Sequence, residues 1–229
     1  MPSASRQGRG RFLFDNGLSL ACLTLFAVFL VAQSLTGWHV HNADALEHGG
    51  HAVAYLTYLS TGHFFEAVFE NWESEFLQMA SFVLLTAYLF QRGSSESKHP
   101  DEENDVDQRP IGRAVKASSP WPVRRGGLWL RLYENSLLLA FTTPFLLSLL
   151  GHALGGVREF NSSQRDHHER EVSTAEYVRG AQFWFESFQN WQSEFLAVGS
   201  IVVLSIFLRQ RGSPESKPVA MPNADMETA

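Results

Sequence analysis

The chain has 229 residues, a formal net charge of -6 and a single cysteine, Cys22. The weak negative charge predicts no nucleic-acid partner, and one cysteine excludes an intramolecular disulfide. The mean hydropathy of -0.12 averages two environments, because four apolar runs alternate with long polar segments. This pattern favours a membrane protein over a soluble domain with one mixed core.

The first apolar run covers residues 17–37 and carries no charged side chain. Its length of about twenty residues matches the hydrocarbon thickness of a bilayer, which predicts a transmembrane helix. Residues 136–156 form a second uncharged run of the same length. Basic residues precede the first run, so a cleaved signal peptide is the alternative. The run at 136–156 lies in mid-chain and cannot be removed in that way, which favours an uncleaved anchor for both.

The other two runs, residues 76–90 and 195–208, are shorter. Extended back to Trp72 and Trp191, they are long enough to cross a bilayer, and the two indole rings are expected at the membrane interface. A soluble four-helix bundle is the alternative fold, but its helices should have polar outer faces. These runs are apolar nearly all round, so the sequence predicts four transmembrane helices.

Two motifs occur twice at the same spacing. N-W-x-S-E-F-L begins at Asn71 and again at Asn190, and Q-R-G-S-x-E-S-K begins at Gln91 and again at Gln210, in both cases 119 positions later. The chain is therefore predicted to use one unit of roughly ninety residues twice. We expect an all-α membrane protein of two tandem transmembrane hairpins, a parallel repeat about an axis along the membrane normal. Its expected parts are repeat 1 at 12–98, a disordered cytoplasmic linker at 99–126, repeat 2 at 129–217 and a disordered tail at 218–229.

Charge sets the predicted orientation. Residues 38–71 contain no Lys or Arg, whereas basic residues follow the second and fourth runs and precede the first and third. By the positive-inside rule, both termini and the linker are cytoplasmic in a multi-pass inner-membrane protein. Four arginines between residues 158 and 179 weaken the rule in the second outer loop. The repeat restores it, because each unit of two spans must enter the membrane in the same sense.

Both outer loops are predicted to carry helical structure. Ser173 and Glu176 have the spacing of a capping box, with Ser173 as the N-cap. Residues 63–72 are expected to form an amphipathic helix that continues into the second span. Aromatic side chains recur on one face of this helix and of its counterpart, and we expect them to serve packing or interfacial anchoring. These stripes are Phe65, Phe69, Trp72 and Phe76, and Trp184, Phe188, Trp191 and Phe195.

Glu75 and Glu194 each lie one turn inside an apolar run, four residues after Asn71 and Asn190. A charged group at a helix centre in the membrane costs roughly 2.5 to 3.5 kcal/mol, so it needs a partner or water. Matched depth along the helices predicts two polar clasps, Gln33 with Glu75 and His152 with Glu194, each supported by the neighbouring asparagine. The alternative is that the two carboxylates bind a cation or relay protons. The candidate site residues are Gln33, Asn71, Glu75, His152, Asn190 and Glu194.

The first outer loop is rich in histidine, but the spacing matches no common zinc signature. Its histidines are His39, His41, His48, His51 and His63. In the second copy only His48 aligns with a histidine, His167, so we predict no high-affinity metal site and no cofactor. Nucleophile-elbow, phosphate-loop and dinucleotide motifs are absent from the sequence, and an enzyme is not predicted.

With both copies of the two motifs in view, the chain resembles an uncharacterised family of bacterial membrane proteins classed as a domain of unknown function. The resemblance implies a four-span inner-membrane protein and supplies no activity. The leading hypothesis is a non-enzymatic structural or accessory component that meets the lipid bilayer and a homo-oligomeric or membrane-protein partner. One alternative is a small cation or proton pathway through Glu75 and Glu194. Another is a membrane enzyme or metal-binding protein that uses the outer histidines.

Overall fold

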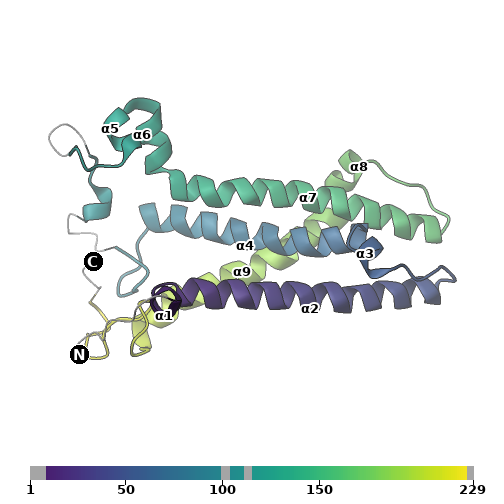
Figure 1. Cartoon of the computed structure of the whole chain (residues 1–229), viewed down its shortest axis with the longest axis horizontal. Coiled ribbons are helices and arrows are strands. Elements are labelled where there is room, and N and C mark those ends of the chain that lie inside the picture. Colours follow the sequence, from purple (N-terminus) through teal and green to yellow (C-terminus); the bar gives the residue numbers. More distant parts are fainter. Residues whose placement is uncertain (1–8, 99–103, 111–114, 226–229) are drawn as a thin grey trace.

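The computed structural model describes residues 9–98, 104–110 and 115–225, and its regular elements are all helices (Figure 1). Four long helices form the body of the molecule: α2 (Gly17–Glu47), α4 (Gly62–Tyr88), α7 (Ser136–Asp166) and α9 (Ala181–Phe207). Among the described residues, α2, α7 and α9 are long and apolar enough to cross a membrane. The fourth, α4, carries four glutamates in its first half and does not reach that level of hydropathy.

Short helices lie at the two ends of the long ones. α3 (Tyr55–Tyr58) and α8 (Thr174–Arg179) lie at one end, and α1 (Arg9–Asp15), α5 (Trp121–Arg125) and α6 (Gly127–Glu134) lie at the other (Figure 1). Within the predicted linker, the described residues contain α5 and a short 3-10 helix, η1 (Asp105–Asp107). The predictions of disorder for residues 99–103, 111–114 and 226–229 fall outside the described residues.

The two halves of the chain form the same elements at the same spacing. α2 and α7 both have 31 residues, α4 and α9 both have 27, and each second-half helix begins 119 positions after its counterpart. Local contacts agree as well, since Asn42 and Asn161 each accept a 2.8 Å bond through Oδ1 from a valine N–H eleven residues later. Aligned positions of the two halves therefore form helices of equal length and share this local contact.

The long helices continue into the predicted first outer loop, residues 38–71, since α2 ends only at Glu47 and α4 begins at Gly62. α4 starts at Gly62, capped by the Thr61 side chain, so the predicted helix at 63–72 is confirmed. The capping box of α8 is confirmed too, because Ser173 N donates to Glu176 Oε2 over 2.8 Å and Glu176 N donates to Ser173 Oγ over 3.2 Å. The bond from the Ser173 backbone lowers the pKa of Glu176. Its cap is therefore complete at neutral pH and is lost only as the pH falls through that lowered value.

The motif Q-R-G-S-x-E-S-K forms a turn at the end of α4 and again at the end of α9. Gln91 N donates to Ser97 Oγ and Gln210 N donates to Ser216 Oγ, both over 2.8 Å. Gly93 stands at the bend with a φ of 83°, in the left-handed region that glycine enters at little cost. The motif is thus accounted for by the local fold rather than by chemistry.

The most extensive helix contact joins α4 to α7, that is, across the two halves of the chain. Gly151 and Gly155, four residues apart on α7, let the two backbones approach closely. A Cβ added to Gly155 would lie 2.7 Å from the Glu66 N atom, and one added to Gly151 would lie 2.5 Å from Phe69 Cγ. This approach brings the glutamates of α4 against α7, whereas α2 touches α4 more lightly.

The buried core is small and lies towards the α8 end. Ala153, Val157, Tyr177 and Phe183 form one apolar cluster between α7, α8 and α9. Most large apolar side chains of α2 and many of α7 and α9 are exposed on the outside of the molecule. Such surfaces are compatible with helices whose surroundings are lipid rather than water.

The close approach of α4 and α7 predicts opposite effects for two glycine substitutions. Gly155→Ala should destabilise the fold by about 1 to 3 kcal/mol, because its Cβ meets backbone atoms that cannot move aside. Gly199→Ala on α9, where nothing lies within 4 Å of the added Cβ, should be neutral or stabilising through helix propensity. Thermal unfolding of the purified variants in one detergent measures both, and equal effects would contradict the packing.

Candidate functional site

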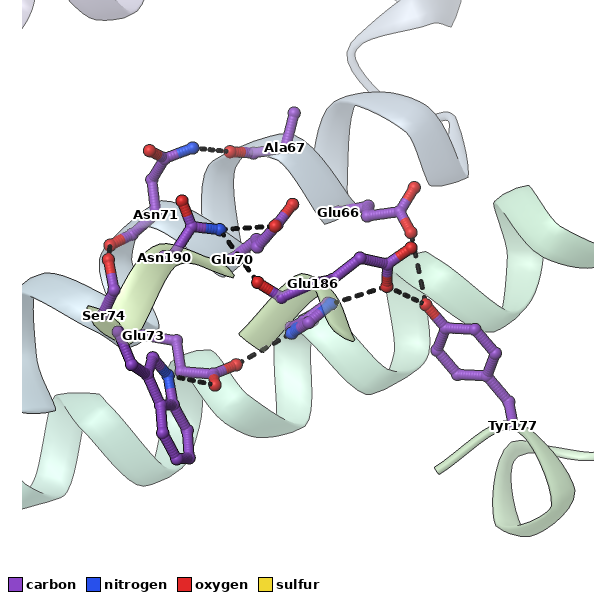
Figure 2. A network of polar contacts seen from close by, with 11 residues as sticks. Glu66, Ala67, Glu70, Asn71, Glu73, Ser74, Tyr177, Glu186 and Asn190 are labelled. Atoms are coloured by element: carbon purple, nitrogen blue, oxygen red, sulfur yellow. Dashed lines mark hydrogen bonds and ion pairs between the residues drawn. The ribbon is translucent and has the colours of Figure 1, made fainter. Parts of the chain in front are cut away.

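His152 lies on α7 and is fully buried, with 0 % of its surface exposed. Its Nδ1 atom is 2.8 Å from Oε2 of Glu73 on α4, and its Nε2 atom is 3.3 Å from Oε2 of Glu186 on α9 (Figure 2). Phe183 stacks on the imidazole with ring centroids 4.7 Å apart. One imidazole thus joins three long helices.

Hydrogen bonds extend this contact in both directions. Tyr177 on α8 donates its hydroxyl proton to Glu186 Oε2 over 2.6 Å, and the same hydroxyl lies 3.3 Å from Glu66 Oε1 (Figure 2). At the other end, Trp191 Nε1 donates to Glu73 Oε1 over 2.9 Å. A continuous chain of polar contacts results, and we call it the His152 network. It consists of Glu73, His152, Glu186, Tyr177 and Glu66.

The network holds a proton that has two places to lie. Each contact between a ring nitrogen and a carboxylate oxygen needs one proton between its two atoms. Either a cationic imidazole lies between two carboxylates, or a neutral imidazole lies beside one neutral glutamic acid. The two forms differ only in the position of one proton along a short hydrogen bond. Glu73, His152 and Glu186 can therefore exchange a proton without any movement of the helices.

Negative charge exceeds positive charge in this region. Four glutamates, Glu66, Glu70, Glu73 and Glu186, lie around one imidazole, and Glu70 accepts a hydrogen bond from the Asn190 amide. Within the described residues, no Lys or Arg side chain forms an ion pair with any of the four. Several unbalanced charges in an apolar interior are costly. The region must therefore retain protons on some carboxyl groups or take up a cation.

The same geometry offers a possible place for such a cation. Glu66, His152 and Glu186 each present one ligand atom, and these atoms lie within 4.8 Å of one another. Carboxylate oxygens and an imidazole nitrogen are a common donor set for divalent first-row metals. A bound metal would take the place of the protons that now link these groups.

The members of the network differ in exposure. Glu73 and His152 are fully buried, whereas the Glu186 side chain is 17 % exposed and accepts a hydrogen bond from the exposed Gln182. Burial raises the pKa of Tyr177, and its bond to Glu186 raises it further, so the phenol stays a donor. The partly exposed members of the network are therefore Glu66 and Glu186, whereas Glu73 and His152 are closed off from solvent.

The predicted clasp pairings are wrong. His152 contacts Glu73 and Glu186 in place of Glu194, and Gln33 Nε2 donates to the Ala67 carbonyl over 3.3 Å in place of Glu75. The prediction compared depth along the helices and did not consider which helical face each side chain occupies. Glu73 and Glu75 are two residues apart, which turns their side chains about 200° from each other. Glu73 faces α7 and is buried, and Glu75 faces outward and is exposed.

The asparagines contact other groups than the predicted carboxylates. Asn71 Nδ2 donates to the Ala67 carbonyl over 2.7 Å, and Asn190 Nδ2 donates to the Glu186 carbonyl over 3.2 Å and to the Glu70 side chain. The half-buried Glu194 offers its backbone carbonyl to the Gln78 side chain over 3.3 Å.

The two signature tryptophans have equivalent packing and different polar contacts. Trp72 lies 6.0 Å from Phe26 of α2, and Trp191 lies 6.3 Å from Phe145 of α7, measured between ring centroids. Trp191 alone reaches a carboxylate, that of Glu73. Their place at a membrane interface stays a prediction.

Sequence reasoning missed most of the network because it gave weight to residues present in both copies. Three glutamates of α4 occur in the first copy only, and their second-copy counterparts are uncharged. Glu66, Glu70 and Glu73 align with Phe185, Gln189 and Gln192, and Glu186 aligns with Ala67. Their spacing of four and three residues places these α4 glutamates on one face of a helix, and that pattern was available in the sequence.

The comparison with known families gives one result. The family model described as Domain of unknown function (DUF6766) matches residues 9–228. The chain belongs to the DUF6766 family. This match covers both halves of the chain, and the family description names no activity. Comparison with curated proteins and with solved structures found no match.

The geometry predicts how this DUF6766 chain responds to loss of the imidazole. His152→Leu leaves Glu73 and Glu186 buried without their shared partner, and we expect a loss of about 3 to 5 kcal/mol of stability. Adding Glu73→Gln and Glu186→Gln removes the stranded charges and should restore a large part of that loss. Thermal unfolding in detergent, with the single and triple variants side by side, gives both values.

Gln33→Leu is the matched control, because Gln33 occupies the corresponding position of the first half and bonds only a backbone carbonyl. Loss of this hydrogen bond should lower the stability of the fold by about 0.6 kcal/mol, the average for a hydrogen bond between helices in a membrane. If His152→Leu proved as mild as Gln33→Leu, the buried ion-pair geometry would be contradicted.

Proposed function

We propose that this chain is a four-span, non-enzymatic inner-membrane component that binds and releases protons at the His152 network. The observation that carries the proposal is the complete burial of His152 with each ring nitrogen on a carboxylate of a different helix. Ionisable groups inside a membrane are costly and mark functional sites by default. A purely structural contact between these helices would need no surplus of glutamates.

The contacts of α4 support its role as the fourth span. α4 packs along α7 and also contacts α9, and both of these helices are apolar enough to cross a membrane. Its glutamates Glu66, Glu70 and Glu73 contact groups of α7, α8 and α9. Charged side chains that face the interior of a helical bundle are the kind that spans tolerate. Low hydropathy is therefore no obstacle to α4 crossing the bilayer.

The orientation follows from charge. Residues 38–61, which lie towards the end with α3 and α8, contain no Lys or Arg, so we assign the opposite end, with α1, α5 and α6, to the cytoplasm (Figure 1). α3 and α8 then lie on the outer side, and the His152 network opens outward beside α8. Both termini and the linker are cytoplasmic in this arrangement.

One-sided access favours proton binding over a proton pathway. The network ends at the buried Glu73, and beyond it towards the cytoplasmic end the facing parts of α4, α7 and α9 are composed largely of apolar residues. Of the two carboxylates in the pathway hypothesis, Glu75 is exposed on the outside of the bundle. Protonation from the outer side would therefore alter how three helices pack, and we propose that a partner in the membrane senses this change.

Trp191 supplies a reporter for the test, because its indole donates directly to Glu73. We expect the tryptophan emission of the reconstituted protein to shift when the outer side is acidified in right-side-out vesicles. In inverted vesicles the same external acidification should have no effect. A dye trapped inside should record no proton flux above that of protein-free vesicles.

Two variants assign the signal. Trp191→Phe should abolish the pH-dependent shift, whereas Trp72→Phe, the corresponding residue of the first half, should retain it. A shift that survives Trp191→Phe, a response in inverted vesicles alone, or a proton flux through the protein would each contradict the proposed function.

A further inference from the structure

A second group of ionisable side chains lies at the α8 end of the molecule, outside the His152 network. The ends of α2 and α7 meet there around a hollow of about 710 Å³. Histidines and acidic residues from both halves line it: His41, Asp44, His48, Glu159, Asp166, His167 and His168. None of these side chains belongs to the His152 network.

His48 and His167 are the one pair of outer histidines that the two halves share. Their rings lie side by side with centroids 6.2 Å apart. Each ring is held the same way, since Nδ1 of His48 is 3.0 Å from the Asp44 carbonyl and Nδ1 of His167 is 2.8 Å from the Ser163 carbonyl. Both rings are exposed and are fixed mainly by these contacts to their own helix.

This arrangement prepares each imidazole as a metal ligand. An Nδ1–H that donates to a backbone carbonyl fixes the tautomer in which Nε2 carries the lone pair. Histidine ligands of metals almost always have their other nitrogen held in this way. Zinc–nitrogen distances of about 2.0 to 2.1 Å place the centroids of two imidazoles on one tetrahedral ion about 5 to 6 Å apart. The observed separation needs little adjustment to reach that value.

The surroundings of the pair carry several acidic side chains and suit a cation. Asp44 Oδ1 lies 3.5 Å from His48 Nδ1, and Asp166 directly precedes His167. The one arginine of the hollow, Arg165, pairs with Glu171 over 3.1 Å. The Asp44 carbonyl, followed by its carboxylate, raises the pKa of His48, so protons compete with a metal at low pH.

A further histidine lines the same hollow at an unusual backbone position. His168 has a φ of 57°, in the left-handed region, where the first half has Gly49. Glycine is the residue that adopts this conformation without strain. His168 thus lines the hollow at a cost in backbone strain.

We propose that His48 and His167 bind one divalent first-row transition cation of the zinc class at the outer junction of the two halves. An acidic side chain of the hollow and water complete the coordination. The sequence alone predicted no high-affinity site from the spacing of the histidines. The fold joins residues that are far apart in the chain, and spacing does not report that.

The test uses Zn²⁺ titrated into the purified full-length chain in detergent at mildly alkaline pH, followed by calorimetry. We expect one Zn²⁺ per chain and a rise of the unfolding temperature with Zn²⁺. His48→Ala and His167→Ala should each weaken binding by about tenfold or more. His51→Ala is the matched control, an exposed histidine of the same loop outside the hollow, and it should leave the affinity unchanged.

Because neither ring is buried, the variants should unfold at the same temperature as the unchanged chain when Zn²⁺ is absent. That measurement shows that they are folded. His152→Gln separates this site from the buried carboxylates. Binding that survives His48→Ala and is lost in His152→Gln would place the metal at Glu66, His152 and Glu186 and overturn the proposal. Absence of Zn²⁺ binding to the folded chain would overturn it as well.

Discussion

The structure depends on the burial of one imidazole between two carboxylates that belong to different helices. A buried ionisable side chain is tolerated only where its partners are in place, and removal of one partner leaves an uncompensated charge. Glu73, His152 and Glu186 meet this condition over distances of 2.8 and 3.3 Å. Because α4, α7 and α9 each supply one member, the ion pair also fixes how the two halves of the chain meet. Gly151 and Gly155 of α7 let the backbone of α4 approach closely enough for this contact.

The two halves share one scaffold and differ in chemistry. Gln33 occupies the place of His152, and Ala67 that of Glu186, so the first half keeps a side chain to backbone bond where the second half has an ion pair. On α4 the difference runs the other way, because the first half has glutamates where the second half has uncharged residues. Neither half contains the complete network. Because its ionisable groups are divided between the two halves, the network forms only when both halves fold together.

Much of the fold could be predicted from the sequence. Apolar runs located the long helices, and the spacing of Ser173 and Glu176 predicted the start of α8 because capping is a local interaction. The pairing of helices could not be predicted in the same way. Matched depth suggested that each hairpin closes on itself, whereas Gly151 and Gly155 favour contact of α7 with α4. Small residues allow a close approach of two helices, but the sequence does not say which of the other helices will be the partner.

The site was predicted in part for the same reason. His152 and Asn190 contact the carboxylates of Glu73, Glu186 and Glu70 in place of Glu194. Glu75 lies two residues from Glu73, on the opposite face of α4. The glutamates of the network have no acidic counterpart 119 positions away, so a comparison of the two halves does not point to them. The pairing of His48 with His167 is a further contact that only the fold supplies.

Nitrogen NMR of the imidazole of His152 tests the central contact most directly. Labelled histidine in the full-length protein, compared with a His152→Gln sample, assigns the two ring signals. The structure predicts that both nitrogens are engaged in hydrogen bonds with carboxyl groups, and that neither shows the signal of a free, unbonded imidazole nitrogen near neutral pH. A free nitrogen that titrates as an exposed imidazole does would contradict a ring held between Glu73 and Glu186.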